Sequence, residues 1–286
     1  MTPQPRHLAT WLIAARPKTL CASVVPVLVG TALVPRVDWL LFGCTLLSAV
    51  CIQVGTNYVN DALDFKRGAD TAARLGPLRV TQAGLLSAAA VMRGAYVCFA
   101  SAVALGVPLV VRGGWPIVII GLASVTAAYL YTGGPYPLAY HGLGELFVLI
   151  FFGVVAVCGT VYVQTLAFDA ASTIAGIAVG LLSVAILSIN NLRDVDNDRL
   201  SNKKTLIVRL GATFGRIEIA LAALLPFACA IVLRRYVPLL ALPLALLLIV
   251  RVNRSEGTAL NRCLAIAGAL EWAFGILFVI GSAVGR

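Results

Sequence analysis

The sequence has 286 residues, of which 60% are hydrophobic and 12% charged, and its formal net charge is +10. Soluble domains carry about twice that charged fraction, so the composition excludes an ordinary soluble protein. The basic residues flank long apolar runs, which excludes nucleic acid as the partner, and the seven cysteines form no C-x-x-C pair that would indicate a zinc or redox site.

Apolar segments of membrane-spanning length follow one another along the whole chain. A helix needs roughly 20 apolar residues to cross a bilayer core about 30 Å thick. In chain order, the predicted spans are approximately Cys21–Val34, Trp39–Tyr58, Ser87–Val111, Trp115–Tyr131, Leu146–Val163, Ala170–Ile189, Thr213–Leu233, Tyr236–Val252 and Leu264–Val284. The first is expected to begin earlier, because Trp11 to Ala15 is also apolar. The sequence therefore predicts an all-α polytopic membrane protein, a bundle of nine transmembrane helices forming one domain over residues 1–286.

The distribution of Lys and Arg predicts the orientation. With nine spans, the face that holds the N-terminus carries 17 of the 22 Lys and Arg residues, and the other face carries 5. The positive-inside rule places the richer face in the cytoplasm. We therefore expect a cytoplasmic N-terminus, and anionic lipid headgroups or anionic substrates as partners of the basic residues.

Polar side chains gather at the cytoplasmic end of the second predicted span. Asn57, Asn60, Asp61 and Asp64 stand at i, i+3, i+4 and i+7, so a helix places them on one face. An isolated cluster of this kind could equally be a solvated, capped helix end. A second cluster makes that explanation less favourable.

The sixth predicted span ends in the second cluster. Asn191, Asp194 and Asp198 stand at i, i+3 and i+7 and are also expected on one helix face. Two acidic faces at one membrane surface repel each other unless a cation lies between them. Carboxylate and amide oxygens suit Mg²⁺, whereas zinc is disfavoured because the chain has only two histidines.

Basic residues follow both clusters. Lys66 and Arg79 come after the first, and Arg193 and Lys203 surround the second. They can be topology determinants, but Mg²⁺ with nearby Lys and Arg is also how proteins neutralise a diphosphate. The residues alone therefore predict a membrane cavity, open to the cytoplasm, that binds a divalent metal and a lipid-like diphosphate.

At this point the residues resemble a known family. Asn60-Asp61-x-x-Asp64 and Asp194-x-x-x-Asp198 look like the two aspartate-rich motifs of the UbiA superfamily of intramembrane prenyltransferases, which have nine transmembrane helices. Within it, the chain looks most like the polyprenyltransferases that act on 1,4-dihydroxy-2-naphthoate in menaquinone biosynthesis. The similar stretches lie between about residues 10 and 215 and include Arg16–Leu20, Asn60–Asp70, Leu75–Arg79, Tyr131–Pro137, Gly142–Glu145 and Asn190–Gly211.

The sequence departs from the family pattern at two places. The strict first motif would have a third Asp where Gly68 stands, and Asp70 comes two residues later. Asn202 precedes Lys203 where the family usually has glycine. The first departure puts the set of metal ligands in doubt.

The resemblance implies electrophilic aromatic substitution in a bacterial inner membrane. Mg²⁺ held by Asp61, Asp64, Asp194 and Asp198 would bridge the diphosphate of a polyprenyl diphosphate. The dihydroxynaphthoate would attack the resulting allylic cation and lose its carboxylate to give demethylmenaquinone. Asn57, Asn60, Lys66, Arg79, Asn191, Arg193 and Lys203 are the expected substrate contacts.

Two further residues are candidates with a plain structural alternative. Arg16 could bind the acceptor's carboxylate or could anchor the membrane edge. Tyr131 could act on the cation together with other tyrosines of the loop 131–145, or belong to an interfacial tyrosine belt.

Other functions remain open at this level. One alternative is a UbiA-type prenyltransferase that acts on another aromatic acceptor, 4-hydroxybenzoate or homogentisate. Only the resemblance favours dihydroxynaphthoate over these acceptors. A secondary transporter would use the two polar faces as an ion path, although both clusters lie on one membrane side.

Overall fold

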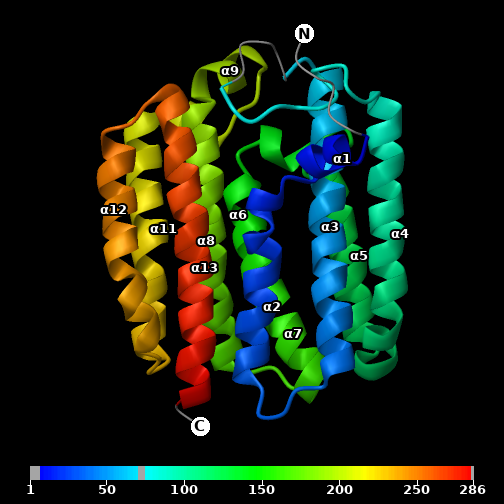
Figure 1. Cartoon of the computed structure of the whole chain (residues 1–286), viewed down its shortest axis with the longest axis vertical. Coiled ribbons are helices and arrows are strands. Elements are labelled where there is room, and N and C mark those ends of the chain that lie inside the picture. The colour runs from blue at the N-terminus through cyan, green and yellow to red at the C-terminus, as the bar shows by residue number, and fades with distance from the viewer. Residues whose placement is uncertain (1–6, 70–74, 285–286) are drawn as a thin grey trace.

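The structure, a computed structural model, describes residues 7–69 and 75–284, in which all regular elements are helical (Figure 1). The helices of the first half are α1 His7–Ala15, α2 Cys21–Leu33, α3 Trp39–Lys66, α4 Ala88–Gly113, α5 Trp115–Leu130, α6 Gly144–Val148 and α7 Ala156–Thr165, with a π-helical segment Leu149–Val155 between the last two. Those of the second half are α8 Ala170–Arg193, α9 Val195–Leu200, α10 Leu206–Leu210, α11 Ala212–Val232, α12 Leu242–Asn253 and α13 Leu260–Val284. Short 3₁₀ turns lie at Pro17–Thr19, Leu138–Tyr140, Val237–Ala241 and Gly257–Ala259.

Each predicted span coincides with an apolar helical segment. Within the described residues, six helices are long and apolar enough to cross a membrane, and the bent pair α1–α2 could form a seventh. Trp115–Leu130 and Val237–Asn253 are apolar but shorter. The all-α polytopic class is therefore confirmed, whereas the count of nine spans stays a prediction.

An apolar helix does precede Cys21, but it is bent away from α2, so the earlier start of the first span stays a prediction. Leu8–Thr19 and Cys21–Leu33 meet at an angle of 53°. Arg16 adopts a left-handed backbone conformation (φ 52°) directly before Pro17, and proline disfavours helical geometry in the preceding residue. The break places Arg16 at the bend.

The helix α8 forms the centre of the second half of the bundle and packs against α2, α11 and α13. It also approaches the π-helical segment backbone to backbone. A Cβ atom added to Gly153 would lie 2.4 Å from the carbonyl oxygen of Gly176, and one added to Gly180 would lie 2.7 Å from that of Leu149. Small residues permit this close approach, which is typical of helix packing in membranes.

Both acidic clusters lie at one end of the bundle, the end where α1 and α9 are found (Figure 1). The helix α3 continues to Lys66, well past the predicted end at Tyr58, so the first cluster is helical throughout. The second cluster differs from its prediction: α8 ends at Arg193 and α9 begins at Val195, so the expectation of one continuous face was wrong. The run Asp-Val-Asp-Asn-Asp consists mostly of poor helix formers, which is consistent with an interruption there.

Candidate active site

Asp61 holds the loop that follows α3. Its side chain is buried, with 1% exposed, and its two carboxylate oxygens accept hydrogen bonds from the backbone N–H groups of Val80 (3.2 Å) and Thr81 (2.9 Å). A buried carboxylate is tolerated when hydrogen bonds satisfy it. Asp61 therefore fixes the position of the loop segment that carries Arg79.

Asp64, one turn later on α3, joins two loops. Its Oδ2 atom lies 3.3 Å from the guanidinium of buried Arg79, and its Oδ1 atom accepts a hydrogen bond from the Tyr140 hydroxyl at 2.9 Å. Burial, and then the Asp64 carboxylate, raise the pKa of Tyr140, so this hydroxyl stays a donor. The Arg67 guanidinium lies 5.2 Å from the Tyr140 ring centre and the Lys203 ammonium 5.9 Å from it.

Asp198 faces the same space from α9. Its Oδ1 atom lies 3.5 Å from the Lys203 ammonium, whereas its buried Oδ2 atom has no hydrogen-bond partner among the described residues. Burial raises the pKa of Asp198 to about 6, the carboxylates of Asp194 and Asp64 add to this, and Lys203 opposes it. Tyr140 donates to Asp64, and the Lys203 ammonium, which pairs with Asp198, lies 5.9 Å from the Tyr140 ring centre, so the two clusters meet around Tyr140. We call this group of residues the acidic chamber (Asp64, Asp198, Arg79, Lys203 and Tyr140).

Asp194 and Arg193 form a framework beside this chamber. Both carboxylate oxygens of Asp194 accept from the Arg193 guanidinium, at 2.8 and 2.5 Å. The same guanidinium donates to Asn261 of α13 at 2.9 Å, and Asn261 donates to the carbonyl of Leu75 at 3.0 Å. The end of α8 is thereby tied to α13 and to the loop after α3. Asn261 was not predicted, because a single Asn outside any motif carries no signal in the sequence.

The three asparagines of the clusters are engaged with other parts of the chain. Asn57 donates to the carbonyl of Ala15 (2.9 Å) and to the Thr19 hydroxyl (3.2 Å), which fixes the bend between α1 and α2. The Asn60 side-chain oxygen accepts from the hydroxyl of Thr132, after α5. Asn191 is bonded to a buried carboxylate, that of Glu145.

The buried carboxylate of Glu145 is joined to α8 through Asn191. Asn191 donates to the Oε1 atom of Glu145 at 2.8 Å, and both side chains are buried. The Tyr131 hydroxyl lies beside Gly144, the neighbour of Glu145, since a Cβ atom added to Gly144 would lie 3.2 Å from its oxygen. The Tyr131 carbonyl also accepts a hydrogen bond from the N–H of Ala139, the neighbour of Tyr140, at 2.9 Å.

Two of the predicted site residues, Arg16 and Lys66, lie outside the acidic chamber. Arg16 stands at the bend, next to Ala15, which Asn57 holds. Lys66 is exposed at the end of α3 and makes no ion pair with any described residue. Asp70 lies outside the described residues.

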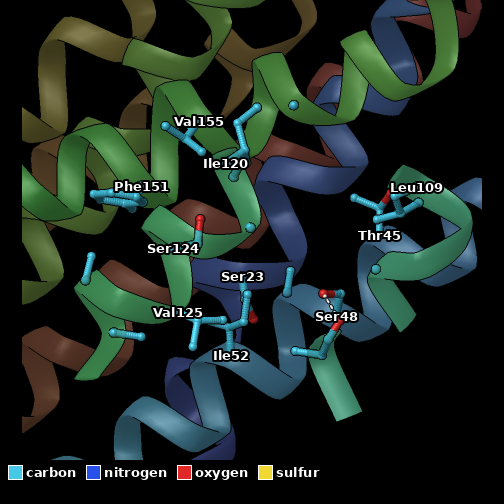
Figure 2. A pocket seen from close by; sticks show the side chains of 18 of the residues that line it. Ser23, Thr45, Ser48, Ile52, Leu109, Ile120, Ser124, Val125, Phe151 and Val155 are labelled. Atoms are coloured by element: carbon cyan, nitrogen blue, oxygen red, sulfur yellow. Dashed lines mark hydrogen bonds between the residues drawn. The ribbon is translucent and has the colours of Figure 1, made fainter. Parts of the chain in front are cut away.

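A large apolar cavity lies below the chamber, toward the middle of the bundle. Its volume is about 490 Å³, and it is open on one side. Helices α2, α3, α4, α5 and α7 line it, and Figure 2 shows Ser23, Ile52, Val125 and Phe151 directed into it. Gln53, Thr56 and Tyr131 are among the residues that line it. Tyr131 thus borders the apolar cavity, while its hydroxyl lies beside Gly144.

The site fits a hard cation only in part. Among the residues that the structure describes, no three His, Cys, Asp or Glu side chains come close enough to hold a metal ion by themselves. Asp64 and the unpartnered Oδ2 atom of Asp198 nonetheless supply oxygen ligands to one chamber. Mg²⁺ usually binds through one or two carboxylates together with substrate phosphates, so these residues suit an ion shared with a diphosphate.

Comparisons with known proteins identify the family and the fold. The model of the UbiA prenyltransferase family matches residues 23–275. The 1,4-dihydroxy-2-naphthoate octaprenyltransferase of Haemophilus influenzae is 34% identical, with 97% of each chain covered. That of Mycobacterium tuberculosis is 37% identical, over 94% of this chain and 98% of the relative. A UbiA homologue from Archaeoglobus fulgidus, solved with DMAPP and Mg²⁺, shares the fold with a TM-score of 0.62 at 15% identity, covering 95% of this chain and 99% of its own.

Proposed function

Because the chain belongs to the UbiA prenyltransferase family, we propose that this membrane enzyme transfers a polyprenyl group from polyprenyl diphosphate to 1,4-dihydroxy-2-naphthoate. Diphosphate and CO₂ leave, and the product is the reduced, dihydroxy form of demethylmenaquinone. The observation that carries the proposal is the position of Tyr131, which lines the apolar cavity of about 490 Å³ and whose carbonyl accepts from the N–H of Ala139, next to Tyr140 of the acidic chamber, at 2.9 Å. A lipid-like diphosphate needs such a pair of compartments, one for each part of the molecule.

The diphosphate would bind in the acidic chamber. Asp64 and Asp198 would hold Mg²⁺ there, and the ion would neutralise diphosphate charge as the carbon–oxygen bond breaks. Arg79 and Lys203 now pair with these two carboxylates and are close enough to donate to phosphate oxygens instead. Arginine and lysine are common phosphate partners, so their charge favours departure of the leaving group.

Asp61 and Asp194 were predicted as ligands of the metal, and we now propose a supporting role for both. Asp61 is engaged by two backbone N–H groups, and Asp194 by the Arg193 guanidinium. In these positions they fix the loop after α3 and the end of α8, and so hold Arg79 beside Asp64. Asn57, Asn60 and Asn191 would serve the same framework.

The reacting carbon would lie at the junction of the two compartments. The Tyr131 and Tyr140 rings can stabilise the allylic cation through their π faces, and the apolar cavity keeps water away from it. Tyr140 also donates to Asp64, which keeps its ring at the edge of the chamber. Arg16, at the bend fixed by Asn57, is the proposed partner of the acceptor's carboxylate.

We propose a bacterial cytoplasmic membrane as the location, with the site on the cytoplasmic side. The clusters and most basic residues lie toward one end of the bundle, and the positive-inside rule assigns that end to the cytoplasm. A transporter role is set aside, because the chain belongs to an enzyme family.

The acceptor is the point that needs an experiment. Purified protein in lipid nanodiscs is incubated with polyprenyl diphosphate, Mg²⁺ and, in separate reactions, 1,4-dihydroxy-2-naphthoate, 4-hydroxybenzoate or homogentisate. We expect prenylated, decarboxylated product from the naphthoate alone. Turnover of one of the other acceptors would support the alternative UbiA function, and no turnover with any acceptor would overturn the proposal.

A further inference from the structure

Gln53 is a polar residue in the wall of the apolar cavity, and the proposed function gives it no role. It stands one turn before Asn57 on α3, and it borders the cavity with only 7% of its surface exposed. Its Oε1 atom is buried and has no hydrogen-bond partner among the described residues. A buried acceptor without a partner is costly, so a native structure that keeps one calls for an explanation.

The orientation of the Gln53 amide follows from the hydroxyl of Thr19. That hydroxyl donates its single proton to the Arg16 carbonyl at 3.0 Å. Toward its other neighbours it can therefore only accept, and it accepts from Nδ2 of Asn57 at 3.2 Å and from Nε2 of Gln53 at 3.5 Å. The nitrogen of the Gln53 amide is thus directed at Thr19, and the atom that lacks a partner is the oxygen.

The buried hydroxyls of the cavity wall differ from Gln53, because they already have partners. Ser23, Thr56 and Thr160 each donate to a backbone carbonyl three or four residues earlier, at 2.7–3.0 Å. Among the described residues that line the cavity, only Gln53 has a buried side-chain oxygen or nitrogen atom without a partner. Its Oε1 atom is therefore the place in this wall where a donor from a bound molecule would be accepted.

Gln53 and Asp64 lie on the same side of α3. Eleven positions separate them, which is about three turns, or about 16 Å along the helix axis. A metal-bound diphosphate, its allylic carbon and one C–C–O arm of an aromatic ring contain about eight covalent bonds in line, which advance about 10 Å. Metal coordination at one end and a hydrogen bond at the other add about 7 Å. Gln53 therefore stands at the distance where the ring of the acceptor would lie.

The chemistry of Oε1 selects between the two substrates. An amide oxygen accepts hydrogen bonds and needs a donor. The prenyl chain has no donor, whereas ionised phosphate and carboxylate groups are acceptors. The donors are the two hydroxyl groups of dihydroxynaphthoate. The 1-hydroxyl is adjacent to the carboxylate of the same molecule and bonds to it internally, so the 4-hydroxyl is the donor left for the protein.

We propose that Gln53 is a specificity-determining residue whose Oε1 atom accepts a hydrogen bond from the 4-hydroxyl of 1,4-dihydroxy-2-naphthoate. The terminal torsion of glutamine is broad, so a small rotation turns Oε1 from the wall toward the ring. Thr19 bonds to both Gln53 and the Arg16 carbonyl, so Gln53 and Arg16 are positioned to bind the 4-hydroxyl and the carboxylate of one ring. This inference rests on the proposed function, since it assumes that the acceptor binds beside Arg16.

An acceptor analogue that lacks the 4-hydroxyl, 1-hydroxy-2-naphthoate, tests this contact. Gln53→Leu removes Oε1 and leaves an apolar side chain that suits a membrane helix. Gln164→Leu is the matched control, because Gln164 is 9% exposed, does not line the cavity, and bonds through both amide atoms to the backbone of Asp38. For each protein in nanodiscs, with saturating polyprenyl diphosphate, we would measure the KM for dihydroxynaphthoate and the inhibition constant of the analogue as its competitor.

We expect Gln53→Leu to raise the KM for dihydroxynaphthoate at least tenfold and to leave the inhibition constant of the analogue within twofold of the wild type. Gln164→Leu should leave both constants within twofold, although its Tm should fall because the Asp38 backbone loses its partners. If Gln53→Leu leaves the KM unchanged, or raises both constants in equal proportion, the contact is refuted while the proposed function stands. Absence of any product from the wild type and dihydroxynaphthoate would refute the proposed function itself.

Discussion

The sharpest test of the site separates Asp61, which holds a loop, from Asp64, which faces the chamber. In Asp61→Asn, the side-chain oxygen can still accept from one of the N–H groups of Val80 and Thr81, while the new amide group opposes the other. One hydrogen bond to a charged acceptor is lost, worth about 1.5–3 kcal/mol. At 1.36 kcal/mol per factor of ten, the population with Arg79 correctly placed falls about 10- to 150-fold.

The assay is prenyl transfer measured over a range of Mg²⁺ concentrations. Asp61→Asn should lower kcat by that factor and leave the Mg²⁺ concentration for half-maximal activity within twofold of the wild type. Asp64→Asn should raise that concentration at least tenfold, because it removes a proposed ligand. If extra Mg²⁺ restores the activity of Asp61→Asn, Asp61 binds the metal directly and the reasoning fails. Size-exclusion profiles in detergent check that both variants are folded.

Four further predictions address the surroundings of the site. Tyr140→Phe removes a donor to the buried Asp64 carboxylate and should reduce kcat/KM about tenfold together with a lower Tm. Lys203→Ala should raise the KM for the prenyl diphosphate at least tenfold, whereas Lys204→Ala, an exposed neighbour, should stay within twofold. Asn191→Ala leaves buried Glu145 without its donor and should destabilise the protein by about 2–3 kcal/mol, seen as a lower Tm; an unchanged Tm would argue against the contact. EDTA should abolish transfer and added Mg²⁺ should restore it, and activity that persists in chelator would contradict the metal proposal.

The sequence by itself determined the class of protein. Hydropathy is a local property, so the apolar segments were found along the whole chain and each coincides with a helix. The helical period also placed Asp61 and Asp64 together on α3, where the structure has them. It could not show that the helix is interrupted at Asp194, because poor helix formers are tolerated or not according to their tertiary contacts.

Only the tertiary structure decided what each polar side chain does. Asp61 and Asp64 look alike in the motif, yet one accepts from loop N–H groups 19 and 20 residues later and the other pairs with Arg79 and Tyr140. The cavity could not be predicted from the sequence either, because helices that are distant in the sequence line it together. Such partners and spaces arise from segments distant in sequence, and a local pattern carries no information about which distant groups will meet.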